Sequence, residues 1–202
     1  MQTIENKIIS KVYGKGRGWA FSKNDFNALG SATAIDKGLS RLTKANKVRR
    51  VMHGVYDYPK YSDLLKQTLS PDMDQVAQAL ARKFNWRIQA SGNAALNILG
   101  LSTQIPATFV YLSDGPSRSY QIGQAELSFK KEALKNIGFK YRESGLIVHA
   151  LKTLGKAHVD DKVIDKIRQQ VDDNKYKQIM KDTRSVTSWM LEMIRKICRD
   201  GS

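Results

Sequence analysis

The sequence predicts an α+β fold in two parts, and three observations support this prediction. Two short helical patterns lie on either side of Gly30, and the run that follows Lys47 is typical of a β-hairpin. The middle of the chain holds short strand patterns, and after Lys130 the pattern is helical. Helix, turn, helix and hairpin is the order of a winged helix-turn-helix, so we expect that fold at the N-terminus. A mixed α/β C-terminal domain with a small sheet and a helical tail is expected to follow.

The chain opens with an amphipathic helical pattern over residues 3–13, then a glycine-rich loop over residues 14–18 and a short strand over residues 19–21. The loop, GKGRG, holds Lys15 and Arg17 but lacks the spacing of a nucleotide phosphate loop. We interpret it as a basic loop that touches the DNA backbone, and a plain turn is the alternative.

The first helix of the central pair is expected to begin at Ser22 and to end at Gly30. The Ser22 hydroxyl can accept a backbone N–H of the first turn, and Asp25 places an acid near the positive helix end. Phe26 and Leu29 are the residues expected to face the core.

The second helix is expected to run from a possible cap at Thr33 to about Ala45. At 100° per residue, its apolar residues cluster on one face, and these are Ile35, Gly38, Leu39 and Leu42. The opposite face carries hydroxyls and cations, with Asp36 at its edge, and consists of Thr33, Lys37, Ser40, Arg41 and Lys44. Such a face suits a DNA major groove, although an ordinary solvated helix can have the same composition.

The hairpin after this helix favours the DNA-binding interpretation. Its strands are expected at residues 48–51 and 55–58, with the turn at His53 and Gly54. On such a wing, Arg49, Arg50 and His53 would lie beside backbone phosphates.

Residues 60–69 are expected to cross to the second domain. This domain is expected to begin with a helix whose start lies at residues 70–72. Asp72 and Asp74 form a D-x-D pair, the spacing of metal-binding carboxylates in many nucleotidyltransferases. At a helix start, acids balance the positive end of the helix dipole, so we interpret the pair as a cap. The elements expected next are strands at 87–89, 108–112, 119–122 and 125–129, and helices at 91–99, 145–154, 160–171 and 186–197.

The 202-residue chain carries a net charge of +15, and this charge is uneven. Residues 1–60 carry +8, residues 61–130 carry +1 and residues 131–202 carry +6. A basic excess attracts polyanions such as DNA or RNA but fixes no sequence specificity. Basic surfaces also occur on ribosome-associated and membrane-surface proteins, so charge alone does not decide between these classes.

Several classes of function find no support in the sequence. Cys198 is the single cysteine, which excludes an intramolecular disulfide and a zinc site of the usual Cys/His kind. Residues 88–113 hold no formal charge but are too polar for a membrane span, so we expect a core segment. The three scattered histidines show no ligand spacing, and they are His53, His149 and His158. We expect no catalytic residues, no cofactor, no metal, no membrane contact and a cytoplasmic location.

Two runs of the sequence resemble a known family. LSRLTKANKVRRVMHGVYDYP, residues 39–59, resembles the winged helix of AbiEi-type antitoxins, which belong to type IV toxin–antitoxin systems of abortive infection. SGNAALNILGLSTQIPATFVYLSDGPSR, residues 91–118, resembles the start of their C-terminal domain, with its G-x-x-A-L-x-x-L-G-L core. The resemblance covers roughly residues 5–155, and the tail from residue 156 has no motif that matches.

The resemblance implies a dual role in phage defence. The winged domain would bind inverted repeats of double-stranded promoter DNA and repress its own operon. The C-terminal domain would counter a partner nucleotidyltransferase toxin, with or without stable direct contact.

Three interpretations remain open at this stage. The first is a DNA-binding antitoxin and autorepressor. The second is a repressor without a toxin, whose C-terminal domain dimerises or senses a ligand, and the third is an enzyme. A nucleotidyltransferase gene beside this one would separate the first two. The third lacks a Ser-His-Asp set, a metal cluster and a phosphate loop in the sequence.

We expect the winged helix-turn-helix to occupy residues 1–60 and the C-terminal antitoxin domain residues 61–202, as an α+β core over 61–155 and a helical tail over 156–202. Leucine-zipper heptads are absent from the sequence. We therefore expect a monomer in solution that binds DNA in pairs. A dimer through the Met- and Trp-rich stripe of residues 186–197 is the alternative.

Overall fold

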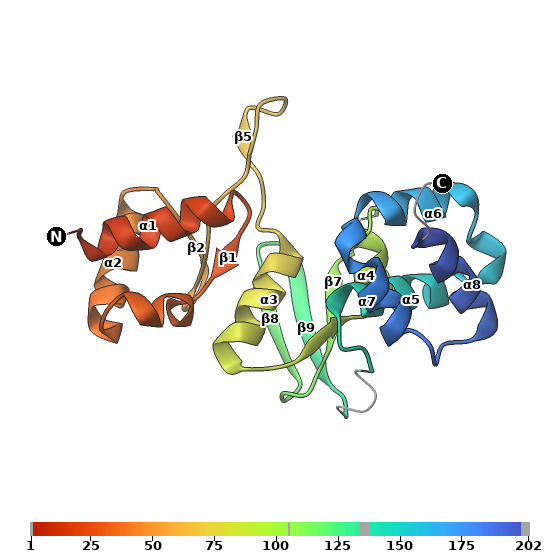
Figure 1. The fold of residues 1–202 in the computed structure, drawn as a ribbon. Helices are drawn as coiled ribbons and strands as arrows, with labels where there is room; N and C mark the ends of the chain where they lie inside the picture. The colour runs from red at the N-terminus through yellow and green to blue at the C-terminus, as the bar shows by residue number, and fades with distance from the viewer. Residues whose placement is uncertain (1, 105, 134–137, 199–202) are drawn as a thin grey trace. The chain divides into compact units, whose positions relative to one another are not determined.

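The structure is a computed structural model that describes residues 2–104, 106–133 and 138–198. It has helices and three small sheets, which confirms the predicted α+β class (Figure 1). The elements fall into two compact units, each with its own core.

The first unit comprises Met1–Trp86 with Gln121–Gln124, and the second comprises Arg87–Tyr120 with Ala125–Ser202. The main division therefore follows Trp86, whereas the expected domain boundary was at residue 60. The difference arises from one helix, α3, which packs against β1, β3 and η1 of the first unit.

The first unit contains the predicted sequence of helix, strand, helix, helix and hairpin. Its elements are α1 (Ile4–Lys15), β1 (Ala20–Phe21), the 3-10 helix η1 (Lys23–Leu29), α2 (Ala32–Lys44), β2 (Arg49–Met52), β3 (Val55–Asp57), β4 (Tyr61–Ser62), β5 (Gln67–Thr68) and α3 (Met73–Phe84). Strands β1, β3 and β2 form an antiparallel sheet in that order.

The core of this unit lies between α1, η1 and α2. Ile8 and Val12 of α1, Phe26 of η1 and Leu39 of α2 are fully buried, and Phe21 joins them from β1. The ring of Phe26 meets that of Phe21 edge-on at 5.3 Å between centroids. This apolar contact fixes η1 and α2 against α1, so the opposite face of α2 is left to solvent.

Two helix starts differ in detail from the expectation. The cap of α2 is Ser31 rather than Thr33, and its hydroxyl accepts the N–H of Ala34 at 3.3 Å. At η1, the N–H of Ser22 donates to the Asp25 carboxylate at 2.9 Å. Asp25 therefore fixes this start, and the helix is 3-10.

Residues 60–69 form an antiparallel hairpin, not a plain crossing segment. Strands β4 and β5 pair Tyr61 with Thr68 and Ser62 with Gln67. We call residues 60–69 the arm. Strands of two residues are too short to show an alternating pattern, which explains why the sequence did not indicate them.

Helix α3 begins where the D-x-D pair lies, and its start confirms the capping interpretation. The Asp72 carboxylate accepts the N–H groups of Asp74 and Gln75 at 3.1 and 3.2 Å. The helix ends at Asn85, which adopts a left-handed conformation with φ of 56°.

The second unit combines a four-stranded sheet with a group of helices. Its elements are β6 (Ile88–Ala90), α4 (Gly92–Ile98), β7 (Thr108–Ser113), β8 (Arg118–Ile122), β9 (Ala125–Lys131), α5 (Arg142–Leu154), η2 (Lys156–His158), α6 (Asp161–Gln169), η3 (Asp173–Lys175), α7 (Tyr176–Asp182) and α8 (Ser188–Ile197). The strand order is β6-β7-β9-β8, with β6 antiparallel and β9 parallel to β7.

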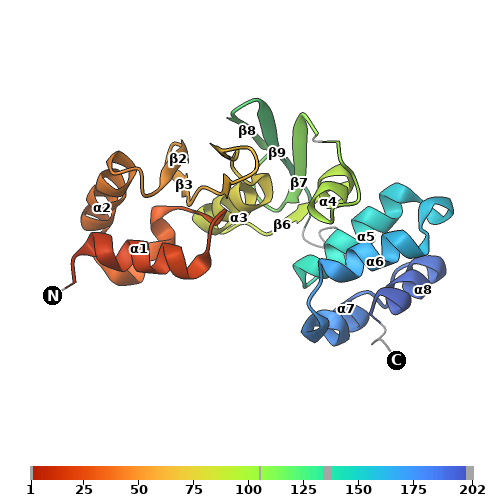
Figure 2. The same cartoon turned by 90° about the horizontal axis from the view of Figure 1, so that it is seen from above.

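Helix α5 is the centre of the second unit, because it contacts β6, α4, α7 and α8. Gly145 lets α5 approach β6 so closely that a Cβ there would lie 1.1 Å from the amide of Gln89. Helix α8 packs against both α5 and α6, and the three helices belong to one group (Figure 2). The Met-rich stripe of α8 contributes Met190, Ile194 and Ile197 to this core, so it is internal packing.

Candidate nucleic-acid interface

The outer face of α2 is the most coherent polar surface of the first unit. Its buried side holds the four predicted residues, and all five predicted polar residues are exposed: Thr33, Lys37, Ser40, Arg41 and Lys44. Among the described residues, neither Lys37 nor Lys44 forms an ion pair. The face therefore offers free ammonium groups beside two short hydroxyls.

Arg41 has a partner on the neighbouring helix. Its Nη1 lies 2.6 Å from Oε1 of Glu5 in α1, although the arginine side chain stays 71% exposed. The hydrogen bond from Arg41 is the main reason why the pKa of the Glu5 carboxyl lies below its usual value. Exposed pairs of this kind contribute little to stability, so Arg41 can exchange Glu5 for a DNA group at small cost.

Asp36, the acid at the edge of this face, is also paired. Its Oδ2 lies 3.1 Å from Nζ of Lys23 in η1, and both side chains are about half exposed. This pair leaves the edge of the face locally neutral and places Lys23 beside it.

Arg49 on β2 was expected on a phosphate, but its guanidinium binds groups of the first unit. Its Nε and Nη2 donate to the two carboxylate oxygens of Asp57 at 3.0 and 2.5 Å. Its Nη1 donates to the Leu69 carbonyl at 2.8 Å, and Asp57 is only 1% exposed. Because the guanidinium neutralises a buried carboxylate, we leave Arg49 out of the proposed interface.

Arg50 and His53 remain on the surface of the same hairpin. Arg50 Nη2 lies 2.9 Å from His53 Nδ1, and both residues are exposed. The His53 carbonyl accepts a hydrogen bond from Lys83 at 3.3 Å, which ties the turn to α3. The outward side chains of Arg50 and His53 are the part of this wing that can reach phosphates.

The two cations of the glycine-rich segment have different roles. Helix α1 extends to Lys15, so this exposed lysine closes a helix, and the loop is shorter than expected. Arg17 donates to the Pro59 carbonyl at 2.9 Å and lies 4.8 Å from the centre of the Tyr58 ring. Arg17 therefore braces the end of the β3 segment while it stays exposed.

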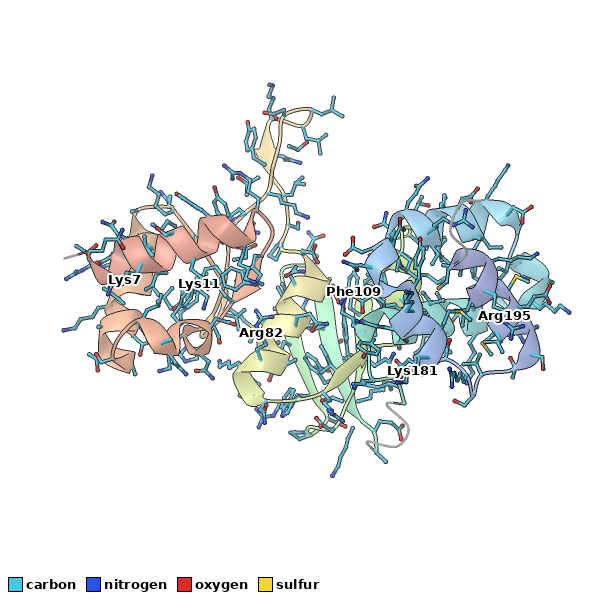
Figure 3. The ribbon with its side chains drawn as sticks, viewed as in Figure 1. Lys7, Lys11, Arg82, Phe109, Lys181 and Arg195 are labelled. Atoms are coloured by element: carbon cyan, nitrogen blue, oxygen red, sulfur yellow. The ribbon has the colours of Figure 1, made fainter. Side chains whose placement is uncertain are left out.

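Helix α3 supplies a structural residue, Arg82, whose role the sequence did not indicate. Arg82, which Figure 3 labels, donates from Nε to Asp25 Oδ1 at 2.7 Å and from Nη2 to the Ala20 carbonyl at 2.8 Å. Its guanidinium also lies 5.9 Å from the centre of the Trp19 ring. These contacts fix α3 to β1 and η1. The two hydrogen bonds join residues 57 and 62 positions apart, a separation that no local sequence pattern reveals.

The titratable groups of the second unit show structural roles. Burial raises the pKa of the Cys198 thiol to about 11, so the thiol stays protonated at neutral pH and is a poor nucleophile. Burial is also the main cause that raises the pKa of Tyr176 to about 12. Within the described ranges, groups of three or more His, Cys, Asp or Glu residues that could hold a metal ion are absent.

Fold and surface together define an α+β protein whose first unit presents a basic helical face on a helix–helix–hairpin scaffold. The chain belongs to the DUF6088 family, a family of unknown function whose model matches residues 7–179. No curated protein matches the chain. None of the helices in the described part of the chain is both long enough and apolar enough to cross a membrane.

One solved structure with a similar chain is that of the RV2827C protein from Mycobacterium tuberculosis. The TM-score is 0.43 at 12% sequence identity, and the match covers 98% of this chain and 77% of that one.

Proposed function

We propose that this protein is a sequence-specific DNA-binding repressor whose α2 lies in the major groove. The observation that carries the proposal is the outer face of α2, where free lysines, Arg41 and two hydroxyls stand opposite a fully buried apolar side. Arginine and lysine donate to guanine edges and phosphates, and short hydroxyls allow close approach to bases. Arg50 and His53 on the hairpin supply phosphate contacts beside the helix.

The charge distribution supports the same proposal. The first 60 residues hold 12 lysines and arginines against four acids, and two of these acids, Asp25 and Asp57, are at most 9% exposed and pair with Arg82 and Arg49. Internal pairing removes those negative charges from the surface. Because each pair also uses one arginine, the net charge of +8 stands, and a positive potential is expected over the exposed lysines of α2.

We further propose, from the resemblance of residues 91–118, that the second unit counters a nucleotidyltransferase toxin and that the protein represses its own promoter. The alternative is a repressor whose second unit senses a ligand or dimerises. Since Met190, Ile194 and Ile197 are buried within the unit, the stripe of α8 offers little apolar surface to a second copy. This favours a monomer in solution that pairs on inverted repeats.

A DNA titration tests the repressor proposal. The probe is a duplex with the DNA directly upstream of the gene, and a shuffled duplex of equal length measures non-specific binding. The change Lys37→Ala/Lys44→Ala should weaken binding to both probes and flatten the salt dependence, because two phosphate contacts are lost. The matched control is Lys162→Ala/Lys166→Ala, which removes two exposed lysines of α6.

Equal losses in the two variants would show that net charge alone drives binding and would refute a specific role for α2. Absence of binding by the unmodified protein would refute the repressor proposal. The toxin proposal has a separate test, which is growth rescue when the protein is expressed with the neighbouring nucleotidyltransferase. Rescue should persist in the Lys37→Ala/Lys44→Ala variant, since those residues lie outside the second unit.

A further inference from the structure

The arm projects from the first unit (Figure 1). Its apex holds two leucines, which follow the paired Ser62 and precede the paired Gln67. Leu64 is 91% exposed and Leu65 is 58% exposed, and Tyr61 on the adjoining strand is 49% exposed. Burial of a leucine side chain stabilises a protein, and these two exposed leucines forgo most of that stabilisation. They contribute nothing visible to the fold, which leaves them free for a partner.

The apex is an ordered turn. The Ser62 hydroxyl accepts the N–H of Leu65 at 3.2 Å, and Lys66 adopts a left-handed conformation with φ of 50°. Two strand pairs close the turn below these residues. The two leucines are therefore consecutive residues at the tip of a narrow, ordered ribbon.

The root of the arm is fixed to the segments that carry the candidate DNA contacts. The Leu69 N–H donates to the Lys60 carbonyl at 2.9 Å, and the Leu69 carbonyl accepts Arg49. On the other side, Arg17 donates to the Pro59 carbonyl. The arm is thus braced by β2 and by the loop after α1.

The size of the apolar surface argues against a protein as the occupant. A stable protein interface buries about 800 Å² on each partner, whereas the arm offers three apolar side chains on strands of two residues. A wedge between base pairs needs only one or two apolar side chains, because phosphate contacts supply most of the affinity. The arm carries Lys60 and Lys66 against the single acid Asp63, although Lys60 also lies 3.7 Å from Asp72. Arg17 adds a cation next to the root of the arm, because it donates to the Pro59 carbonyl.

We infer that the arm is a DNA wedge. Leu64 and Leu65 enter the minor groove beside the site that α2 contacts and unstack a single base step, while Lys66 meets the adjacent phosphate. Pyrimidine–purine steps unstack most easily, so a TA or CA step is the preferred point of entry. This inference rests on the proposed DNA-binding function and adds a second, minor-groove contact to it.

Base unstacking can be measured apart from binding. The probe is a duplex of about 30 base pairs of the upstream DNA, with 2-aminopurine in place of adenine at its TA and CA steps in turn. The full-length protein should raise the fluorescence at one step, because 2-aminopurine brightens when it unstacks. In Leu64→Ser/Leu65→Ser this rise should disappear and affinity should fall about tenfold, with an unchanged salt dependence.

The matched control is Gln67→Ser/Thr68→Ser, which places two serines on exposed residues of the same arm and should keep the fluorescence rise. Thermal unfolding should be the same in all three proteins, because none of these side chains is buried. Binding without any fluorescence rise, or a rise that survives the leucine changes, would overturn the wedge and leave the repressor proposal intact. Absence of binding by the unmodified protein would overturn both. A change of mass in sedimentation, seen only with the leucine variant, would assign the arm to a second copy of the chain and overturn the wedge.

Discussion

The outer face of α2 and strand β2 both carry arginines, but they hold them in opposite ways. Arg41 on α2 is 71% exposed and pairs with a partly exposed Glu5, whereas Arg49 on β2 is 30% exposed and pairs with an almost fully buried Asp57. Breaking the Arg41–Glu5 pair costs little free energy, because water solvates both groups. Breaking the Arg49–Asp57 pair leaves a buried carboxylate without a cation, which is costly. The burial of the partner, more than the residue type, decides which arginine is available to DNA.

The largest expected effect of this difference is on stability. Arg49→Ala leaves Asp57 buried without its cation and removes the donor to the Leu69 carbonyl. We expect the free energy of unfolding to fall by about 3 kcal/mol, measured by urea unfolding at neutral pH. The neighbouring change Arg50→Ala is the control and should stay within about 0.5 kcal/mol. An Arg49→Ala protein of unchanged stability with weak DNA binding would return Arg49 to the interface.

The second effect concerns DNA specificity. Arg41→Ala should reduce affinity for the upstream duplex by about 1–3 kcal/mol, because a base contact is lost, and should affect the shuffled duplex less. Fluorescence anisotropy with both duplexes measures this difference. Lys44→Ala is the comparison on the same face. If Arg41→Ala weakened both duplexes equally, Arg41 would be a phosphate contact.

The third effect tests the wing. Arg50→Ala should weaken binding to all duplexes alike and lower the slope of log affinity against log salt by about 1, as expected for one lost phosphate contact. Titrations at several salt concentrations give the slope. A sequence-dependent loss would instead place Arg50 on a base.

A smaller effect is expected at the acid that competes for Arg41. Glu5→Gln removes the negative charge and frees the guanidinium, so affinity for both duplexes should rise a few-fold at low salt. The same titrations measure it. A loss of affinity for the upstream duplex alone would show that Glu5 instead orients Arg41 for base recognition.

The smallest expected effect is a pH dependence in the second unit. Burial, and then the charge of Lys152, hold the pKa of His149 below its usual value near 6.5. The unfolded chain therefore takes up a proton that the folded chain resists, and stability should fall as the pH drops below about 6.5. Urea unfolding across this range should show the loss, and His149→Gln should reduce it. A wild-type stability independent of pH would contradict this prediction.

The α2 face could be predicted because it depends on local geometry alone. The 100° spacing of Ile35, Leu39 and Leu42 fixes which side is buried, and the structure has that side at the core. The α+β class and most strands followed in the same way from apolar patterns. Specific DNA binding stays a prediction.

The role of Arg49 could not be predicted, because one bulge decides it. Met52 pairs with Val55 next to the turn, so a regular hairpin would place Arg50 opposite Asp57. The register shifts between Arg50 and Met52, and Arg49 faces Asp57 instead. Helix α7 was not predicted, because it is short and buries only Tyr176 and Ile179, which is too few apolar residues for a helical pattern. Its Asp182 accepts the N–H groups of Lys140 and Tyr141, just before α5, from 42 and 41 residues away in the chain.

The contacts of Asp25 determine the shortest N-terminal fragment that can be cut out and grafted onto another protein. This one carboxylate, 9% exposed, holds the start of η1 and receives Arg82 from α3. A fragment cut after Pro59 would keep the predicted contacts of α2 and its hairpin, but it would lose the arm and the cation that neutralises Asp25. A fusion or domain graft that borrows the basic face of α2 should therefore retain the chain through Trp86. The transplantable module is defined by a long-range ion pair, and the end of the hairpin marks no natural cut point.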